Sequence, residues 1–178
     1  VVAVAATNPH VAEECLDLID IEYEVLPSVT NAEDAIKDDA PILHEHIIAS
    51  DVLGAEAGDK PTNIASHIQH TLGDLERGFS EADVVLEREY RTQTVHQGYI
   101  EPQSASASWS RNGQVTVWTC SQGHFGQRDA LSTILGVPVS EIKVVPMEIG
   151  GGFGGKHRVY LEPLAAVLSR KTGLPVKM

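Results

Sequence analysis

The residues of this chain with the clearest chemical potential form one glycine-rich run, Gly150-Gly151-Gly152-Phe153-Gly154-Gly155-Lys156. Glycine loses more conformational freedom on folding than any other residue, so five glycines around one aromatic indicate backbone that must approach something closely. The N–H groups of such a loop can form a nest for a bulky anionic ligand, with Phe153 as the one side chain that shapes the pocket. A flexible turn is the alternative interpretation.

Two phosphate-binding signatures fit this run only in part. The spacing Gly150-x-Gly152-x-x-Gly155 satisfies the dinucleotide pattern, which also requires an acidic residue about twenty positions further on to bind a ribose. Residues 163–178 contain no Asp or Glu. The P-loop pattern requires Ser or Thr after the lysine, where this chain has His157. A nucleotide-binding module that uses residues 150–156 is therefore the weaker interpretation.

A second polar turn, Ser121-Gln122-Gly123-His124-Phe125, follows a predicted strand. Turns at strand ends are common places for binding sites. The amide of Gln122 could donate a hydrogen bond to a ligand without titrating, or it could only satisfy nearby backbone groups.

Apolar periodicity and turn residues predict an α+β fold around these two motifs. Asn112-Gly113 lies between two alternating runs and predicts a β-hairpin. Further strands are expected over 21–26, 84–91 and 142–146. Three helices are expected: one that begins at Asn8-Pro9, one over 127–135 and one over 163–171. The first and last residues read as interrupted strands, so we expect a piece of a longer polypeptide.

Composition excludes several classes of protein. The net charge of -12 argues against nucleic-acid binding, which requires clustered Lys and Arg. The two cysteines are far apart, so neither a disulfide framework nor a zinc site is predicted, and a cytoplasmic location is expected. His44-x-His46 and His67-x-x-His70 lack a third ligand at fixed spacing and do not predict a metal site. No apolar run is long enough to span a membrane.

Taken together, several motifs resemble the large subunit of the xanthine oxidase family of molybdenum hydroxylases. They are the Gln122 turn, Leu135-Gly136-Val137-Pro138 and the glycine run, with further similarity at Val95 to Pro102 and from Val4 to Pro27. The resemblance implies that residues 1–53 are the end of an α/β hammerhead domain and 54–81 a connector. Residues 82–178 would be the truncated first part of a mixed-sheet domain that binds the molybdenum cofactor.

In this family, a substrate carbon is hydroxylated with oxygen from water at a molybdenum held by a pterin, present as molybdopterin or its cytosine dinucleotide. The resemblance implies that Gln122 donates a hydrogen bond to an oxygen on the metal and that the N–H of Phe153 approaches the same group. Gly152 and Gly154 would allow the close approach, Gly123 and Gly151 would also belong to the cofactor site, and no residue of this chain would bind the metal directly. Glu101 is expected to be structural, because the family's catalytic glutamate would lie beyond Met178.

The resemblance also implies iron–sulfur clusters and FAD on partner subunits or domains, and an oligomeric parent protein. Purine-oxidising members carry a glutamate where this chain has His157, so an aldehyde or N-heterocyclic substrate is the better expectation, with His157 in the substrate pocket. His157 facing solvent is the alternative. A catalytically inert α+β fragment also stays open for the isolated chain.

Overall fold

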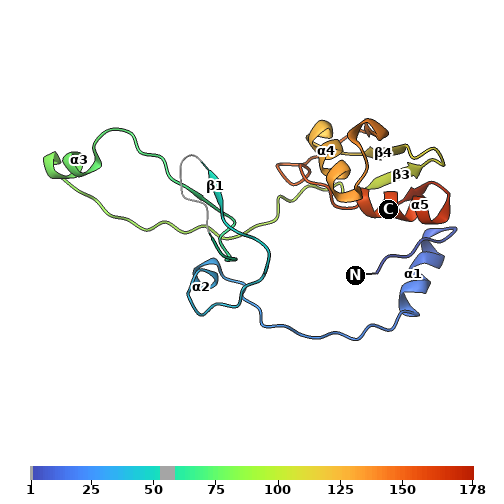
Figure 1. The fold of residues 1–178 in the computed structure, drawn as a ribbon, viewed down its shortest axis with the longest axis horizontal. Helices are drawn as coiled ribbons and strands as arrows, with labels where there is room; N and C mark the ends of the chain where they lie inside the picture. Colours follow the sequence, from blue (N-terminus) through green and yellow to red (C-terminus); the bar gives the residue numbers. More distant parts are fainter. Residues whose placement is uncertain (1, 53–58) are drawn as a thin grey trace. The chain divides into compact units, whose positions relative to one another are not determined.

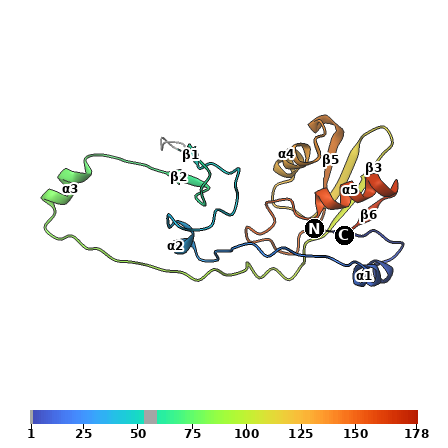
Figure 2. The same ribbon diagram turned by 60° about the horizontal axis from the view of Figure 1, so that its bottom comes forward.

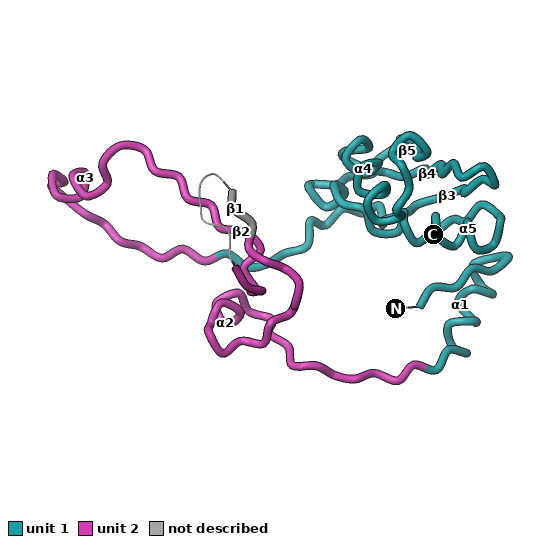
Figure 3. The backbone as a smooth tube through the Cα atoms, viewed as in Figure 1, with its two compact units in different colours: residues 1–20, 92–178 teal, residues 21–91 magenta. Residues whose placement is uncertain are grey.

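The computed structural model of this chain describes residues 2–52 and 59–178. These residues form two compact units, which Figure 3 shows in different colours. The first unit combines Val1–Asp20 with Thr92–Met178, and the second is Ile21–Arg91.

The first unit is built on a mixed four-stranded sheet with the strand order β5-β4-β3-β6, of which Figure 1 labels β3 and β4. Strand β3 (Ala105–Trp109) pairs antiparallel with β4 (Val115–Thr119), and β6 (Val176–Lys177) pairs antiparallel with the other edge of β3. Strand β5 (Ile142–Pro146) lies parallel to β4, so the chain crosses over between them through a helix. The α+β expectation is confirmed for this sheet.

The predicted hairpin is confirmed. Trp109 lies opposite Val115, and the connection turns at Gly113 with φ of 96°. A positive φ is costly for residues with a Cβ, which explains the glycine after Asn112.

The helices also follow the sequence signals. Helix α1 (Pro9–Asp17) begins after Asn8, whose side chain accepts the N–H of Val11 at 3.0 Å. Helix α4 (His124–Leu135) begins three residues before the predicted 127, because Gly123 already serves as its N-cap. Helices α4 and α5 (Glu162–Thr172) both end at a glycine in the left-handed region, as predicted.

Helices α4 and α5 pack on the sheet and form the core of this unit (Figure 2). The alternating residues that face them are small or β-branched, which allows close approach of the helices. The buried cluster consists of Ala107, Val115, Val117, Leu131, Ile142, Ala165 and Ala166.

A buried carboxylate fixes the start of α5. Glu162 accepts hydrogen bonds from the hydroxyl of Thr119 at 2.7 Å and from the N–H of Tyr160 at 2.7 Å. Because Thr119 ends β4, this contact ties the segment after the glycine run to the sheet.

Two predicted strands are wrong. Residues 21–26 and 84–91 keep the alternating pattern of a strand, but neither segment is assigned to a strand. Their apolar residues, such as Val25, Leu86 and Tyr90, are exposed. A strand requires a neighbour for its backbone hydrogen bonds, and no ladder in the described part of the chain includes either segment.

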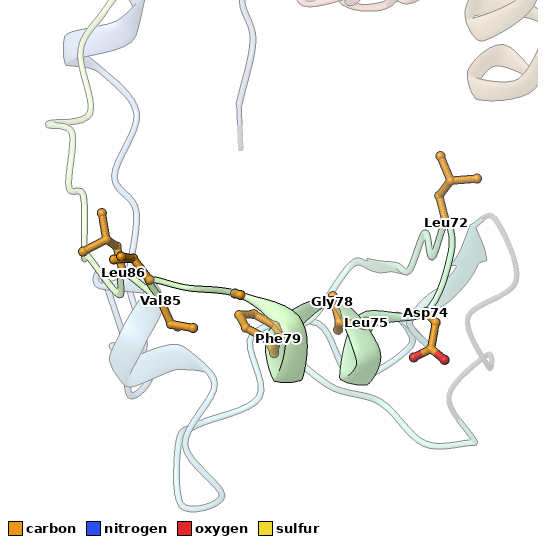
Figure 4. Close-up of a pocket in the computed structure, with 9 residues that line it drawn as sticks. Leu72, Asp74, Leu75, Gly78, Phe79, Val85 and Leu86 are labelled. Carbon is orange, nitrogen blue, oxygen red and sulfur yellow. The ribbon is translucent and has the colours of Figure 1, made fainter.

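The second unit has short elements. They are α2 (Ala32–Ala35), the parallel strands β1 (Ser50–Val52) and β2 (Ser66–Ile68), and α3 (Leu75–Glu81). Asn63 organises its loops, because its side chain contacts the backbone of Leu43, Ala35 and Pro41 at 2.9 to 3.0 Å. An apolar hollow lies between α3 and the residues that follow it, and Figure 4 shows Leu72, Phe79 and Leu86 around it.

The described ranges contain no helix that is long and apolar enough to cross a membrane. They also contain no group of three or more His, Cys, Asp or Glu residues arranged to hold a metal ion.

Leu131 provides a test of the core. Its side chain is 0% exposed, so replacement by Ala should lower the free energy of unfolding by about 2–5 kcal/mol through lost burial and a cavity. Ile134→Ala, on the same helix but 56% exposed, is the matched control and should cost much less. Urea unfolding measures both, and equal losses would contradict this packing.

Candidate cofactor site

The two motifs that could do chemistry lie side by side in the first unit. The Gln122 turn follows the end of β4, and the glycine run follows the end of β5. Since β4 and β5 are parallel neighbours, their carboxyl ends share one edge of the sheet. The N–H of Gln122 donates to the carbonyl of Lys156 at 3.0 Å, which joins the motifs directly.

The side chain of Gln122 holds the glycine run through its oxygen. Oε1 accepts the N–H of Gly154 at 3.0 Å and that of Lys156 at 3.2 Å. Because both partners are donors, the atom that faces them must be the amide oxygen. The amide nitrogen Nε2 therefore faces away from these groups and has no acceptor within the described residues. Gln122 satisfies nearby backbone and also presents a free donor.

Three glycines of the run are required by close side chains, and a Cβ on the first of them, Gly150, would lie 2.8 Å from Cβ of Glu101. A Cβ on Gly152 would lie 2.5 Å from Oε1 of Gln122, and a Cβ on Gly155 would lie 2.6 Å from Cε1 of Tyr99. All three distances are too short for real contacts, so any larger residue would displace the neighbouring side chain. These glycines thus give the three side chains the space in which they pack.

The centre of the run adopts a strained backbone with free donors. Phe153 has φ of 49°, between Gly151 at 92° and Gly154 at 89°. A bulky residue rarely adopts this region, and such strain is often found at functional sites. The ring of Phe153 is 72% exposed. In the described part of the chain, the N–H groups of Gly151, Gly152 and Phe153 have no acceptor, which leaves a row of donors for a ligand.

A second segment lies along the run and was not recognised in the sequence as part of this site. Alternate residues from 97 to 103 face the glycines: a Cβ on Gly155 would meet Gln97 at 3.1 Å, and Gln103 Nε2 donates to the carbonyl of Gly155 at 3.1 Å. Alternation is the pattern of an extended segment with one face in contact. That alternation, at Gln97, Tyr99, Glu101 and Gln103, was the signal available in the sequence.

Glu101 pairs with Lys156, the last residue of the run. The Lys156 ammonium donates to Oε2 of Glu101 and lies 5.0 Å from the centre of the Tyr99 ring. Lys156 is only 1% exposed. The hydrogen bond from Lys156, and after it the N–H of Gly150, holds the pKa of Glu101 below its ordinary value of 4.5. Burial is the largest single influence on Lys156 and would lower its pKa, but the hydrogen bond and charge of Glu101 together with the nearby Cys120 outweigh it and raise that pKa above 10.5.

This pairing argues against both nucleotide signatures. In a P-loop the lysine must reach a phosphate, whereas the Lys156 ammonium is buried against Glu101. Helix α5 begins at Glu162 and not directly after the run, so its N-terminus does not open on the loop.

A hollow beside Gln122 lies between the first turn of α4 and strand β5. Its lining includes Gly123, which begins α4, and the cationic side chains Arg128 and Lys143. His157 is exposed, and its Nδ1 lies 3.9 Å from the position of a Cβ on Gly123. The structure therefore brings Gln122, Gly123, the run 151–154 and His157 into one neighbourhood.

Comparison with known proteins identifies the family. The model of the molybdopterin cofactor-binding domain family matches residues 57–178, more than half of the chain. The chain belongs to this family. Among the described residues, a free amide donor and a row of unpaired N–H groups fit a ligand with hydrogen-bond acceptors.

The relatives are much longer than this chain. The nicotinate dehydrogenase large molybdopterin subunit of Eubacterium barkeri is 30% identical over 178 residues, which are 100% of this chain and 38% of that protein. The carbon monoxide dehydrogenase large chain of Afipia carboxidovorans is 33% identical over 180 residues, which cover 98% of this chain and 22% of that protein. A crystal structure of Cu,Mo-CO dehydrogenase matches 97% of this chain and 22% of its own, with 32% identity and a TM-score of 0.76.

The Glu101–Lys156 pair predicts a pH dependence of stability. Glu101 has a lowered pKa, so its contribution is complete above about pH 5 and is lost as the pH falls through the folded value. Lys156 has a raised pKa, so its contribution is complete below 10.5 and is lost as the pH rises through the folded value. Urea midpoints of the wild type and Glu101→Gln should therefore converge in acid and differ by a constant amount at neutral pH. A difference that grows towards low pH would contradict the pairing.

Proposed function

We propose that this chain forms part of the cofactor cleft of a molybdenum hydroxylase, an oxidoreductase that hydroxylates an aldehyde or N-heterocyclic substrate with oxygen from water. The observation that carries the proposal is the fixed direction of the Gln122 amide. Its oxygen is held by the N–H groups of Gly154 and Lys156, so Nε2 is the atom offered to a ligand.

The residues of the site have distinct roles in this proposal. Gln122 donates through Nε2, and Phe153 donates through its backbone N–H. Gly123, Gly151, Gly152 and Gly154 let the backbone approach the bound group. The molybdenum pterin supplies the redox chemistry when it is bound. Donors that are held in place before binding stabilise developing charge without the cost of reorganisation.

The substrate class rests on His157. Its ring lies beside Gly123 and is exposed, so it can hydrogen-bond a heteroatom of a substrate in the same cleft. An imidazole lacks the negative charge with which a carboxylate accepts the N–H groups of a purine. The names of the relatives, which include nicotinate dehydrogenase, a probable hypoxanthine oxidase and carbon monoxide dehydrogenase, cover several substrates.

We propose the remaining features for the whole protein from the resemblance. Residues 1–53 would be the end of an α/β hammerhead domain, and residues 82–178 would be the first part of the cofactor-binding domain. Residues 54–81 would be the connector between these two domains. The catalytic base would lie in another part of the protein. The pterin would be molybdopterin or its cytosine dinucleotide, with iron–sulfur and flavin modules as partners in a cytoplasmic oligomer. The free thiols Cys15 and Cys120 agree with a reducing compartment.

Gln122→Glu tests the proposed donor. The carboxylate can still accept the N–H groups of Gly154 and Lys156, but it cannot donate, so the loop is kept and the donor is lost. Turnover per bound molybdenum in the full-length holoenzyme should fall by about 10²–10³-fold. Gln114→Glu, in the exposed hairpin turn, is the matched control and should leave turnover unchanged. Molybdenum absent from the wild type would refute the proposed function, and full turnover in Gln122→Glu would remove Gln122 from the site.

His157→Ala tests the substrate contact. If the imidazole binds a heteroatom of the substrate, KM should rise about tenfold with little change in kcat, because binding is lost equally in the ground and transition states. Steady-state kinetics with an aldehyde and an N-heterocycle measure this change. Unchanged KM for both would show that His157 faces solvent.

A further inference from the structure

One carboxylate oxygen joins the two ends of the glycine run. Oε2 of Glu101 accepts the N–H of Gly150 at 2.8 Å and also the ammonium of Lys156. Gly150 is the first residue of the run and Lys156 is the last. The five residues between them are thus closed into a loop by a single acceptor.

The backbone of Lys156 is bonded in turn to the Gln122 turn. Its N–H donates to Gln122 Oε1 at 3.2 Å, and its carbonyl accepts the N–H of Gln122 at 3.0 Å and the hydroxyl of Ser121 at 3.3 Å. The same residue therefore binds Glu101 through its side chain and the Gln122 turn through its backbone.

We propose that Glu101 and Lys156 are a positioning pair for the cofactor site. Closing the loop at Glu101 holds Lys156 in the place from which it fixes the Gln122 amide and the free N–H groups at 151–153. The inference deepens the proposed function and rests on it for the identity of the ligand. The connection between Glu101 and Gln122 through the loop stands on the contacts alone.

The burial of Lys156 distinguishes this ion pair from the ion pairs at the surface. A buried ammonium is costly unless it is paired, so Lys156 holds its position only when Glu101 is present and charged. The Tyr99 ring, whose centre lies 5.0 Å from the ammonium, gives it a second favourable contact. Surface ion pairs, such as Arg77 with Glu81 at 2.8 Å, have no such constraint and contribute little.

The experiment compares Lys156→Met and Glu101→Gln in the full-length protein, with Arg77→Met as the matched control from a surface ion pair. Lys156→Met keeps most of the length of the side chain and removes its charge. Glu101→Gln removes the charge that pairs Lys156 and leaves Gly150 only the weaker acceptor of a neutral amide, and this variant serves if the lysine variant does not fold. The first readout is amide hydrogen exchange in protein made without cofactor. The second readout is the molybdenum content, together with kcat and KM, of protein that was made with its cofactor.

The proposal predicts exchange at least about tenfold faster at Gly150 and Gly154 in both variants, with Val117 in the core strand unchanged. In loaded protein, kcat per molybdenum should fall while the KM for substrate stays the same, because the pair acts on the cofactor side. Arg77→Met should match the wild type in every readout. Exchange at Gly150 and Gly154 that equals the wild type in a folded variant would overturn the proposal. A wild type that holds no molybdenum would remove the proposed function, and the exchange data would still decide whether the pair holds the loop.

Discussion

Four hydrogen bonds to two side-chain oxygens hold the glycine run, and the rest of the site depends on them. Glu101 Oε2 accepts from Gly150 and Lys156, and Gln122 Oε1 accepts from Gly154 and Lys156. A run of five glycines would otherwise have a large conformational entropy to lose. These contacts, with the side chains that pack against Gly152 and Gly155, select one backbone conformation in which three consecutive N–H groups stay free.

The sheet explains why the two oxygens meet at this loop. Parallel pairing of β4 and β5 brings the Gln122 turn and the start of the run to one edge, and Glu162 ties the chain after the run to Thr119. Segment 97–103 also contacts the run. The backbone is thus held by two separate segments before any ligand is present, which is the arrangement expected of a preorganised cofactor site.

Much of the local structure could be predicted because its causes are local. Asn112-Gly113 marked the hairpin, Asn8 marked the start of a helix, and Gly136 and Gly173 marked helix ends. The role of Lys156 could not be predicted from spacing, since its partner Glu101 is 55 residues away and the local pattern imitates a P-loop. The strands expected over 21–26 and 84–91 failed for a related reason: alternation shows a β pattern but does not show whether a neighbouring strand exists. Whether Gln122 and Phe153 contact a cofactor stays a prediction.

The most direct test is an experimental structure of the full-length protein purified from a host that makes molybdenum pterin. The account predicts the cofactor at this edge of the sheet, with an oxygen of its metal centre about 2.7–3.2 Å from Gln122 Nε2 and the N–H groups of residues 151–153 directed towards it. A bound cofactor that contacts neither Gln122 nor the glycine run would contradict it.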